Sequence, residues 1–200
     1  MKHIFTILFC IVTLMAKTQS IELMIHEDGG FGDVQFLKPL SEDYSCTVFS
    51  RTRLDTDFNE NNNLLSALYL NYTTKSGVGG TLLGAVGNNN TSSGAGIHFT
   101  KNTDGFSIFA LPYVTFSEDP TLNWFSIIRY RPQLTEKLRL YTSLELFSVF
   151  DLSHVLSIQR IRLGLEMNSY QFGLGSNLSE LAGTSEITGD YGIFIRKTFN

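Results

Sequence analysis

The sequence predicts an all-β fold, an antiparallel up-and-down β-barrel whose strands cross a membrane, and three observations support this prediction. Apolar and polar residues alternate with a period of two over most of the chain after about residue 43. Several alternating segments run about ten residues or more, a length typical of a tilted membrane-spanning strand. Polar turn sequences such as Asn102-Thr103-Asp104-Gly105 separate the segments.

Counting these segments predicts about ten strands, with eight as the alternative because weak segments such as residues 79–87 are easily miscounted. An even number of strands brings both ends of the barrel chain to the same side of the membrane. The longer polar segments, residues 52–63 and 179–189, are expected as loops on the other side. The expected strands cover residues 44–51, 64–74, 79–87, 94–101, 105–116, 122–131, 137–149, 155–167, 169–178 and 189–199.

The chain is expected to divide into a signal peptide at residues 1–20, a periplasmic or plug segment at 21–42 and the barrel at 43–200. The first segment has a basic residue, Lys2, followed by an apolar run from Ile4 to Met15 that is too short to cross a bilayer as a helix. Residues 21–42 do not alternate cleanly, which is why a segment outside the barrel is expected there.

Charge and cysteine content exclude several classes of partner and site. Removal of the signal peptide leaves 13 of the 15 basic residues against 19 acidic ones, a net charge of −6, so a nucleic-acid partner is not expected. Cys46 is then the only cysteine, which excludes an internal disulfide and a cysteine-based metal site.

Charged residues gather on one face of the alternating strands. In the segment 155–167, Arg160 and Arg162 alternate with Ile161 and Leu163. A charged side chain facing lipid near the bilayer midplane costs about 2–4 kcal/mol, so the arginines are expected to face the lumen. The expected lumen charges are Arg129, Arg139, Glu145, Arg160, Arg162, Glu166 and Arg196.

These seven residues leave two interpretations open. A network of ion pairs can simply fill the interior of a narrow barrel. Alternatively, five arginines against two glutamates leave an excess of three positive charges, which favours a binding site or a narrow pore for small anions. The sequence therefore predicts a structural role or a narrow, anion-preferring one.

Catalytic, cofactor and metal motifs are weak, so we expect no enzyme, no cofactor and no metal site. Asp151, Ser153 and His154 suggest a hydrolase only as a minor alternative, because the members of a catalytic triad come from distant segments. The segment beginning at Asp55 resembles a calcium loop, but Glu60 stands where an EF-hand requires glycine. The sequence has neither a glycine-rich phosphate loop after a strand nor a paired-cysteine zinc spacing.

Three phrases of the sequence stand out, Leu68–Gly77, Tyr141–Phe147 and Gly192–Lys197. Together with the C-terminal strand, they resemble the small, uncharacterised outer-membrane β-barrel proteins common in Bacteroidetes. The resemblance covers roughly residues 44–200 and implies a location in a bacterial outer membrane, contact with its lipid, and no settled activity. The last strand, ending at the aromatic Phe199, implies recognition by the barrel-assembly machinery. The other possibility is a secreted, soluble, lipocalin-like barrel that binds a small apolar ligand.

Overall fold

The computed structural model describes residues 18–57, 62–88, 90–183 and 187–199. The first 17 residues of the expected signal peptide lie outside this part of the chain. Within the described residues the regular structure is β-strand. None of these residues belongs to a helix long and apolar enough to cross a membrane.

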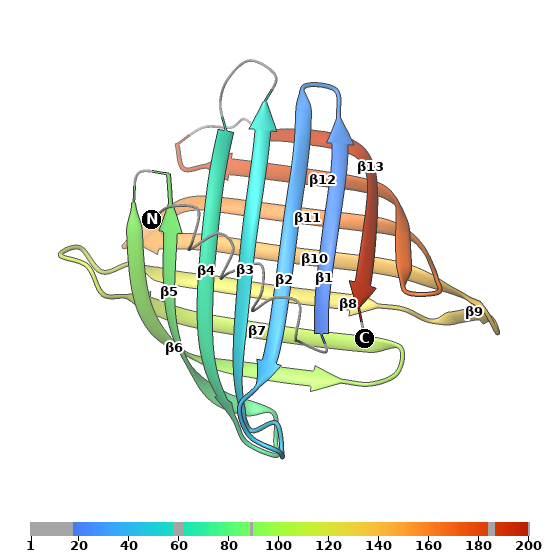
Figure 1. The fold of residues 1–200 in the computed structure, drawn as a ribbon. Helices are drawn as coiled ribbons and strands as arrows, with labels where there is room; N and C mark the ends of the chain where they lie inside the picture. Colours follow the sequence, from blue (N-terminus) through green and yellow to red (C-terminus); the bar gives the residue numbers. More distant parts are fainter. Residues whose placement is uncertain (1–17, 58–61, 89, 184–186, 200) are drawn as a thin grey trace, which may run out of the picture.

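The strands form one closed antiparallel sheet (Figure 1). In the described residues the barrel has 12 strands, and the short β9 pairs only with the start of β10. Hydrogen bonds between β1 and β13 join the first strand to the last, while β10 pairs with both β8 and β11. The strands are β1 (Thr18–His26), β2 (Gly29–Pro39), β3 (Cys46–Asp57), β4 (Asn62–Thr73), β5 (Val78–Gly87), β6 (Thr91–Asn102), β7 (Phe106–Thr115), β8 (Leu122–Tyr130), β9 (Gln133–Thr135), β10 (Leu138–Asp151), β11 (Ser153–Met167), β12 (Tyr170–Leu181) and β13 (Ile187–Phe199).

Two walls of the barrel face each other across the lumen. In Figure 1, β1 to β5 run steeply up the near wall, and β7, β8, β10, β11 and β12 run across the far wall. Phe199 at the end of β13 pairs with Gln19 near the start of β1, so both ends of the barrel chain lie at one end of the barrel. This end is called the C-terminal end below, and the other the opposite end.

The all-β antiparallel barrel is confirmed, but the expected count of about ten strands is too low. All ten expected segments form strands, and the weak segment at 79–87 is β5. The two further strands are β1 and β2, so most of residues 21–42 belongs to the barrel and is neither a tail nor a plug. β1 also begins at Thr18, inside the expected signal peptide. Gly30 and Gly32 occupy positions of β2 where an apolar side chain would have shown the alternation.

The outer surface of the barrel is apolar, as the alternation predicts. In β11, Leu163 is 53% exposed while the neighbouring Arg162 is 4% exposed. In β13, Ile193 is 64% exposed while Phe194 is 3% exposed. Large aliphatic side chains therefore point outwards around the sheet, and charged side chains point into the lumen.

Aromatic residues mark the C-terminal end of the barrel. Five exposed aromatic side chains lie there at strand ends or in the turn before β3: Tyr44, Tyr72, Tyr130, Tyr170 and Phe199. The ammonium group of Lys197 lies 3.9 Å from the centre of the Tyr170 ring. At the opposite end the expected loops are shorter than predicted, because β3 continues to Asp57 and β12 to Leu181.

Candidate functional site

Strand register places a row of four charges side by side on the near wall. Glu22 of β1 lies opposite Arg196 of β13 on one side and opposite Asp33 of β2 on the other. Asp33 in turn lies opposite Arg53 of β3. Side chains at directly opposite positions share one face of a sheet. The four side chains therefore meet at one level of the lumen.

A second group of charges faces this row from the far wall. Glu145 of β10 lies opposite Arg160 of β11, and Ser143 lies between Arg129 of β8 and Arg162 of β11. The side chains of Glu145 and Arg162 are 6% and 4% exposed. Because both groups lie deep inside the barrel, they interact across the lumen.

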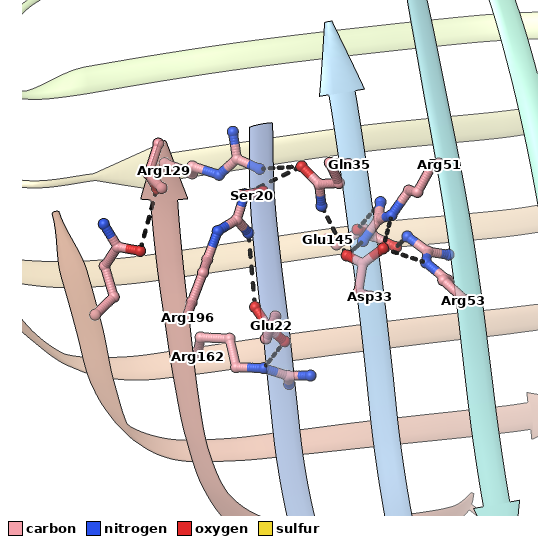
Figure 2. Close-up of polar contacts among 12 residues, drawn as sticks. Ser20, Glu22, Asp33, Gln35, Arg51, Arg53, Arg129, Glu145, Arg162 and Arg196 are labelled. Carbon is pink, nitrogen blue, oxygen red and sulfur yellow. Dashed lines mark hydrogen bonds and ion pairs between the residues drawn. The ribbon is translucent and has the colours of Figure 1, made fainter. Parts of the chain in front are cut away.

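Glu145 is the centre of one set of ion pairs across the lumen. Its carboxylate accepts hydrogen bonds from Arg51 Nη1 at 2.6 Å, from Arg160 Nη1 at 3.0 Å and from Arg53 Nη2. Arg51 also holds Asp33 through two parallel hydrogen bonds, Nε to Oδ1 at 2.8 Å and Nη2 to Oδ2 at 2.5 Å. Figure 2 shows Asp33 and Glu145 flanked by Arg51 and Arg53. This set ties β2 and β3 to β10 and β11.

Glu22 is the centre of the other set. It accepts a hydrogen bond from Arg162 Nε at 2.8 Å, and its second oxygen lies 3.6 Å from Arg196 Nη1. The guanidinium carbon of Arg162 lies 5.5 Å from the centre of the Phe31 ring and 5.8 Å from that of Phe194. These distances are typical of cation–π contacts, so aromatic rings supply part of the environment of this buried cation.

Arginines outnumber acidic residues among the side chains that meet at this level. The residues that meet there, called the lumen charge cluster below, comprise six arginines and three acids. Since arginine stays protonated in proteins, the excess is three positive charges when all three acids are ionised. The cluster consists of Glu22, Asp33, Arg51, Arg53, Arg129, Glu145, Arg160, Arg162 and Arg196.

Arg129 is the arginine of the cluster with the weakest polar contacts. Among the described residues it forms no ion pair, and its hydrogen bond goes to Gln35 Oε1 at 3.5 Å. Figure 2 shows Arg129 pointing towards Gln35 beside Arg196. The buried Nε atoms of Arg53, Arg129 and Arg160 have no hydrogen-bond partner within the described part of the chain. The cluster therefore holds donors that protein groups leave unused.

The structure brings together five of the seven expected lumen charges and separates the other two. Arg139 and Glu166 lie opposite each other in register but near the C-terminal end. Arg139 instead pairs with the exposed Asp104 at 3.1 Å, and Glu166 lies 3.8 Å from Arg131.

Four members of the cluster are not among the seven expected lumen charges. Glu22 and Asp33 lie in β1 and β2, which were not recognised as strands. Arg53 fell in an expected loop, and Arg51 stood at the end of an expected strand. The alternating pattern Arg51-Thr52-Arg53-Leu54 was the available signal, because it continues the period of β3 beyond residue 51.

The lumen has little free space within the lumen charge cluster and more on the side that faces the opposite end. Within the cluster, the hollow lined by Gln35, Arg129, Ser143 and Arg196 measures about 20 Å³, enough for one water molecule. A larger hollow of about 320 Å³ reaches from Arg53 and Arg160 to Gly87 and Asn90 at the opposite end. This apolar hollow has mostly apolar walls, which include Leu65, Tyr69, Leu83, Phe125, Val149 and Ile158.

The residues considered for a hydrolase do not form a catalytic arrangement. His154 Nε2 lies 2.9 Å from Ser157 Oγ, and within the described part of the chain the imidazole forms no hydrogen bond with Ser153. The Ser153 hydroxyl contacts the backbone oxygen of Asp151 at 3.4 Å. Asp151 and Ser153 pair across the tight turn at Leu152, so their backbone positions are set by the hairpin.

Comparison with known proteins identifies the fold. The sequence matches no protein-family model and no curated protein at a significant level. A KdgM porin in complex with disordered oligogalacturonate is 12% identical, with a TM-score of 0.56 over 92% of this chain and 99% of that one. KdgM porin alone gives 12% identity and a TM-score of 0.55 over the same shares. LpxR from Salmonella typhimurium is 9% identical, with a TM-score of 0.48 over 90% and 99% of the two chains. The chain therefore has the porin-like β-barrel fold of outer-membrane proteins such as KdgM.

Proposed function

We propose that this protein is a bacterial outer-membrane barrel whose lumen charge cluster binds small anions and forms a narrow, anion-preferring constriction. The observation that carries the proposal is the excess of three positive charges among the buried and half-buried side chains of the cluster. Arginine donates two hydrogen bonds in parallel, which suits carboxylate and phosphate groups. The unused donors of Arg129 are the first contact we assign to such an anion.

The outer-membrane location is supported by the surface of the barrel. Apolar side chains such as Leu163 and Ile193 cover its outside, where a soluble lipocalin-like barrel would expose polar groups. The aromatic side chains at the C-terminal end match the interfacial girdle of membrane barrels. The neighbour KdgM porin shares the architecture. We also propose that the chain is similar to the small Bacteroidetes barrels and that the barrel-assembly machinery recognises the strand ending at Phe199.

A purely structural network is the competing interpretation, and charge balance distinguishes the two. Glu145 binds three arginines and Glu22 two, which is the arrangement expected of a network that fills the lumen. A buried cation without a partner loses several kcal/mol of hydration, and an anion beside it offsets part of that loss. A structural network alone does not require Arg129, which has no carboxylate partner among the described residues. We assign no enzymatic activity to the barrel.

The apolar hollow indicates which class of anion the lumen charge cluster would bind. A ligand that enters from the opposite end meets apolar and aromatic walls before it meets Arg53 and Arg160. Organic anions with an apolar or ring-shaped body and a carboxylate fit this order of surfaces. The oligogalacturonate of the KdgM complex is also a carboxylate-bearing ring compound, although the two chains share only 12% of their residues.

Ion selectivity in planar lipid bilayers tests the proposal. The wild-type barrel is expected to give a small conductance that prefers anions, because the space within the cluster admits about one water molecule. Arg129→Gln should shift the reversal potential towards cation preference. Arg139→Gln is the matched control, since it removes the same charge from a half-buried site near the C-terminal end, outside the cluster, and should shift the potential less.

Three results contradict the proposal. A cation preference of the wild-type barrel would refute the anion role. A silent barrel whose thermal stability is unchanged by added organic carboxylates would leave the cluster as a structural network. A large, unselective conductance would contradict both interpretations, because neither allows an open lumen.

A further inference from the structure

Three side chains meet near the opposite end of the barrel, one of them two residues beyond Arg53 in β3. His26 is the last residue of β1, Asp55 lies near the end of β3, and Asp190 lies near the start of β13. One imidazole nitrogen and one carboxylate oxygen from each acid all lie within 4.8 Å of one another. The three residues come from separate strands, so the closure of the barrel between β1 and β13 is what assembles them.

His26 is the unusual member of this group. Its side chain is 5% exposed, yet neither ring nitrogen forms a hydrogen bond within the described residues. The nearest charged atom is Asp190 Oδ1, which lies 3.6 Å from Nδ1. A buried polar group without a hydrogen bond is unfavourable, so the ring offers an unused nitrogen atom to an external partner.

Glycines occupy both cross-strand positions beside His26. Its two cross-strand neighbours are Gly29 of β2 and Gly192 of β13, so no neighbouring side chain covers the ring at these positions. A hollow of about 500 Å³ adjoins the imidazole, and Asp28, Asp57 and Asn63 also line it. The rim therefore combines an unpartnered nitrogen ligand with an acidic, water-accessible space.

We propose that His26, Asp55 and Asp190 form a binding site for a divalent transition metal ion such as Zn²⁺. One imidazole and two carboxylates leave at least one coordination position for water, which is typical of a zinc site that is open to solvent. Zn²⁺ ligands lie about 2.0–2.2 Å from the ion, so small side-chain rotations bring the three groups to the required separation. The nitrogen ligand favours Zn²⁺ over Ca²⁺ and Mg²⁺, which prefer oxygen.

This site is independent of the anion-binding proposal. Its charge is opposite to that of the lumen charge cluster, and the two groups share no residue. Bound Zn²⁺ would crosslink β1, β3 and β13 at the rim, so it should stabilise the closed barrel. Ion binding that occurs in the folded barrel alone raises its thermal stability in proportion to the logarithm of the metal concentration.

Isothermal titration calorimetry on the folded, full barrel in detergent tests the site, with ZnCl₂, CaCl₂ and MgCl₂ as probes. One Zn²⁺ per chain is expected, together with a rise in the melting temperature, while Ca²⁺ and Mg²⁺ should bind more weakly. His26→Ala and the near-isosteric Asp190→Asn should each weaken Zn²⁺ binding by more than about tenfold. Asp119→Asn is the matched control, because it removes a carboxylate from an exposed loop at the same end and should leave the affinity unchanged.

Electrophoretic mobility without boiling checks that each variant still forms the barrel, so a folding defect is not mistaken for a lost ligand. Absence of Zn²⁺ binding in the wild-type barrel would overturn the proposal. Equal affinity of the wild-type and His26→Ala barrels would do the same, since it would show surface binding.

Discussion

At the scale of single residues, the position of a side chain on the inner or outer face decides what a substitution does. Glu145 and Leu144 are neighbours in β10, but Glu145 is buried among arginines. A lumen acid is tied to partners on both walls, whereas an outward residue contacts only its neighbours and lipid. Substitutions on the two faces therefore test different parts of the structure.

Loss of Glu145 is expected to destabilise the barrel strongly. Glu145→Gln keeps the shape of the side chain but leaves Arg51, Arg53 and Arg160 without the carboxylate that they share. Breaking a buried ion pair by removing one partner costs about 3–5 kcal/mol. Urea unfolding of the folded barrel in lipid should show this loss of unfolding free energy, while Glu136→Gln in an exposed turn should show almost none.

The orientation of β11 predicts that Leu163→Arg harms folding more than Arg160→Leu. Leu163 is 53% exposed on the outer face, where an arginine near the bilayer midplane costs about 2–4 kcal/mol. Arg160→Leu removes one partner of Glu145, which retains Arg51 and Arg53. Folding yield in lipid vesicles measures the difference. Equal yields would mean that Leu163 lies away from the bilayer midplane or that it faces the lumen.

At the scale of strands, the alternating pattern predicts an element wherever both faces carry side chains. β10 to β13 have apolar residues on one face and polar ones on the other, so their existence and orientation were predictable. In β2 the outward positions include Gly30 and Gly32, which carry no apolar signal. Ion-pair partners such as Glu22 and Arg162 are 140 positions apart in the chain. Only the closure of the sheet brings them together, so the composition of the cluster was only partly predictable.

Because β1 is part of the barrel wall, a charge on its outer face is expected to impair folding. Leu23 is 56% exposed and lies between Gly32 of β2 and Ile195 of β13. Leu23→Arg therefore places a charge against lipid and should lower the folding yield in vesicles. The control is Leu40→Arg, which is equally exposed at 55% but lies in the turn after β2. Equal yields for the two variants would indicate that residues 21–42 lie outside the membrane.

At the scale of the whole molecule, closure between β1 and β13 removes every long exposed edge. The pairing runs from Gln19 opposite Phe199 to His26 opposite Gly192. Backbone groups along these strands are therefore satisfied inside the sheet, which a hydrocarbon environment requires. The same closure assembles both the row Arg196–Glu22–Asp33–Arg53 and the group at the rim.

Closure predicts that the barrel resists detergent until it is boiled. Without a free sheet edge, unfolding has no exposed strand from which to begin. An unboiled sample is therefore expected to migrate differently from a boiled one on a denaturing gel and to be recovered with the outer-membrane fraction. Deletion of residues 18–26 removes β1 and leaves β2 and β13 without their shared partner, so the mobility difference should disappear. A wild-type chain that is soluble and migrates identically in both samples would contradict the membrane location. A deletion variant that keeps the difference would show that β2 and β13 can close the barrel directly.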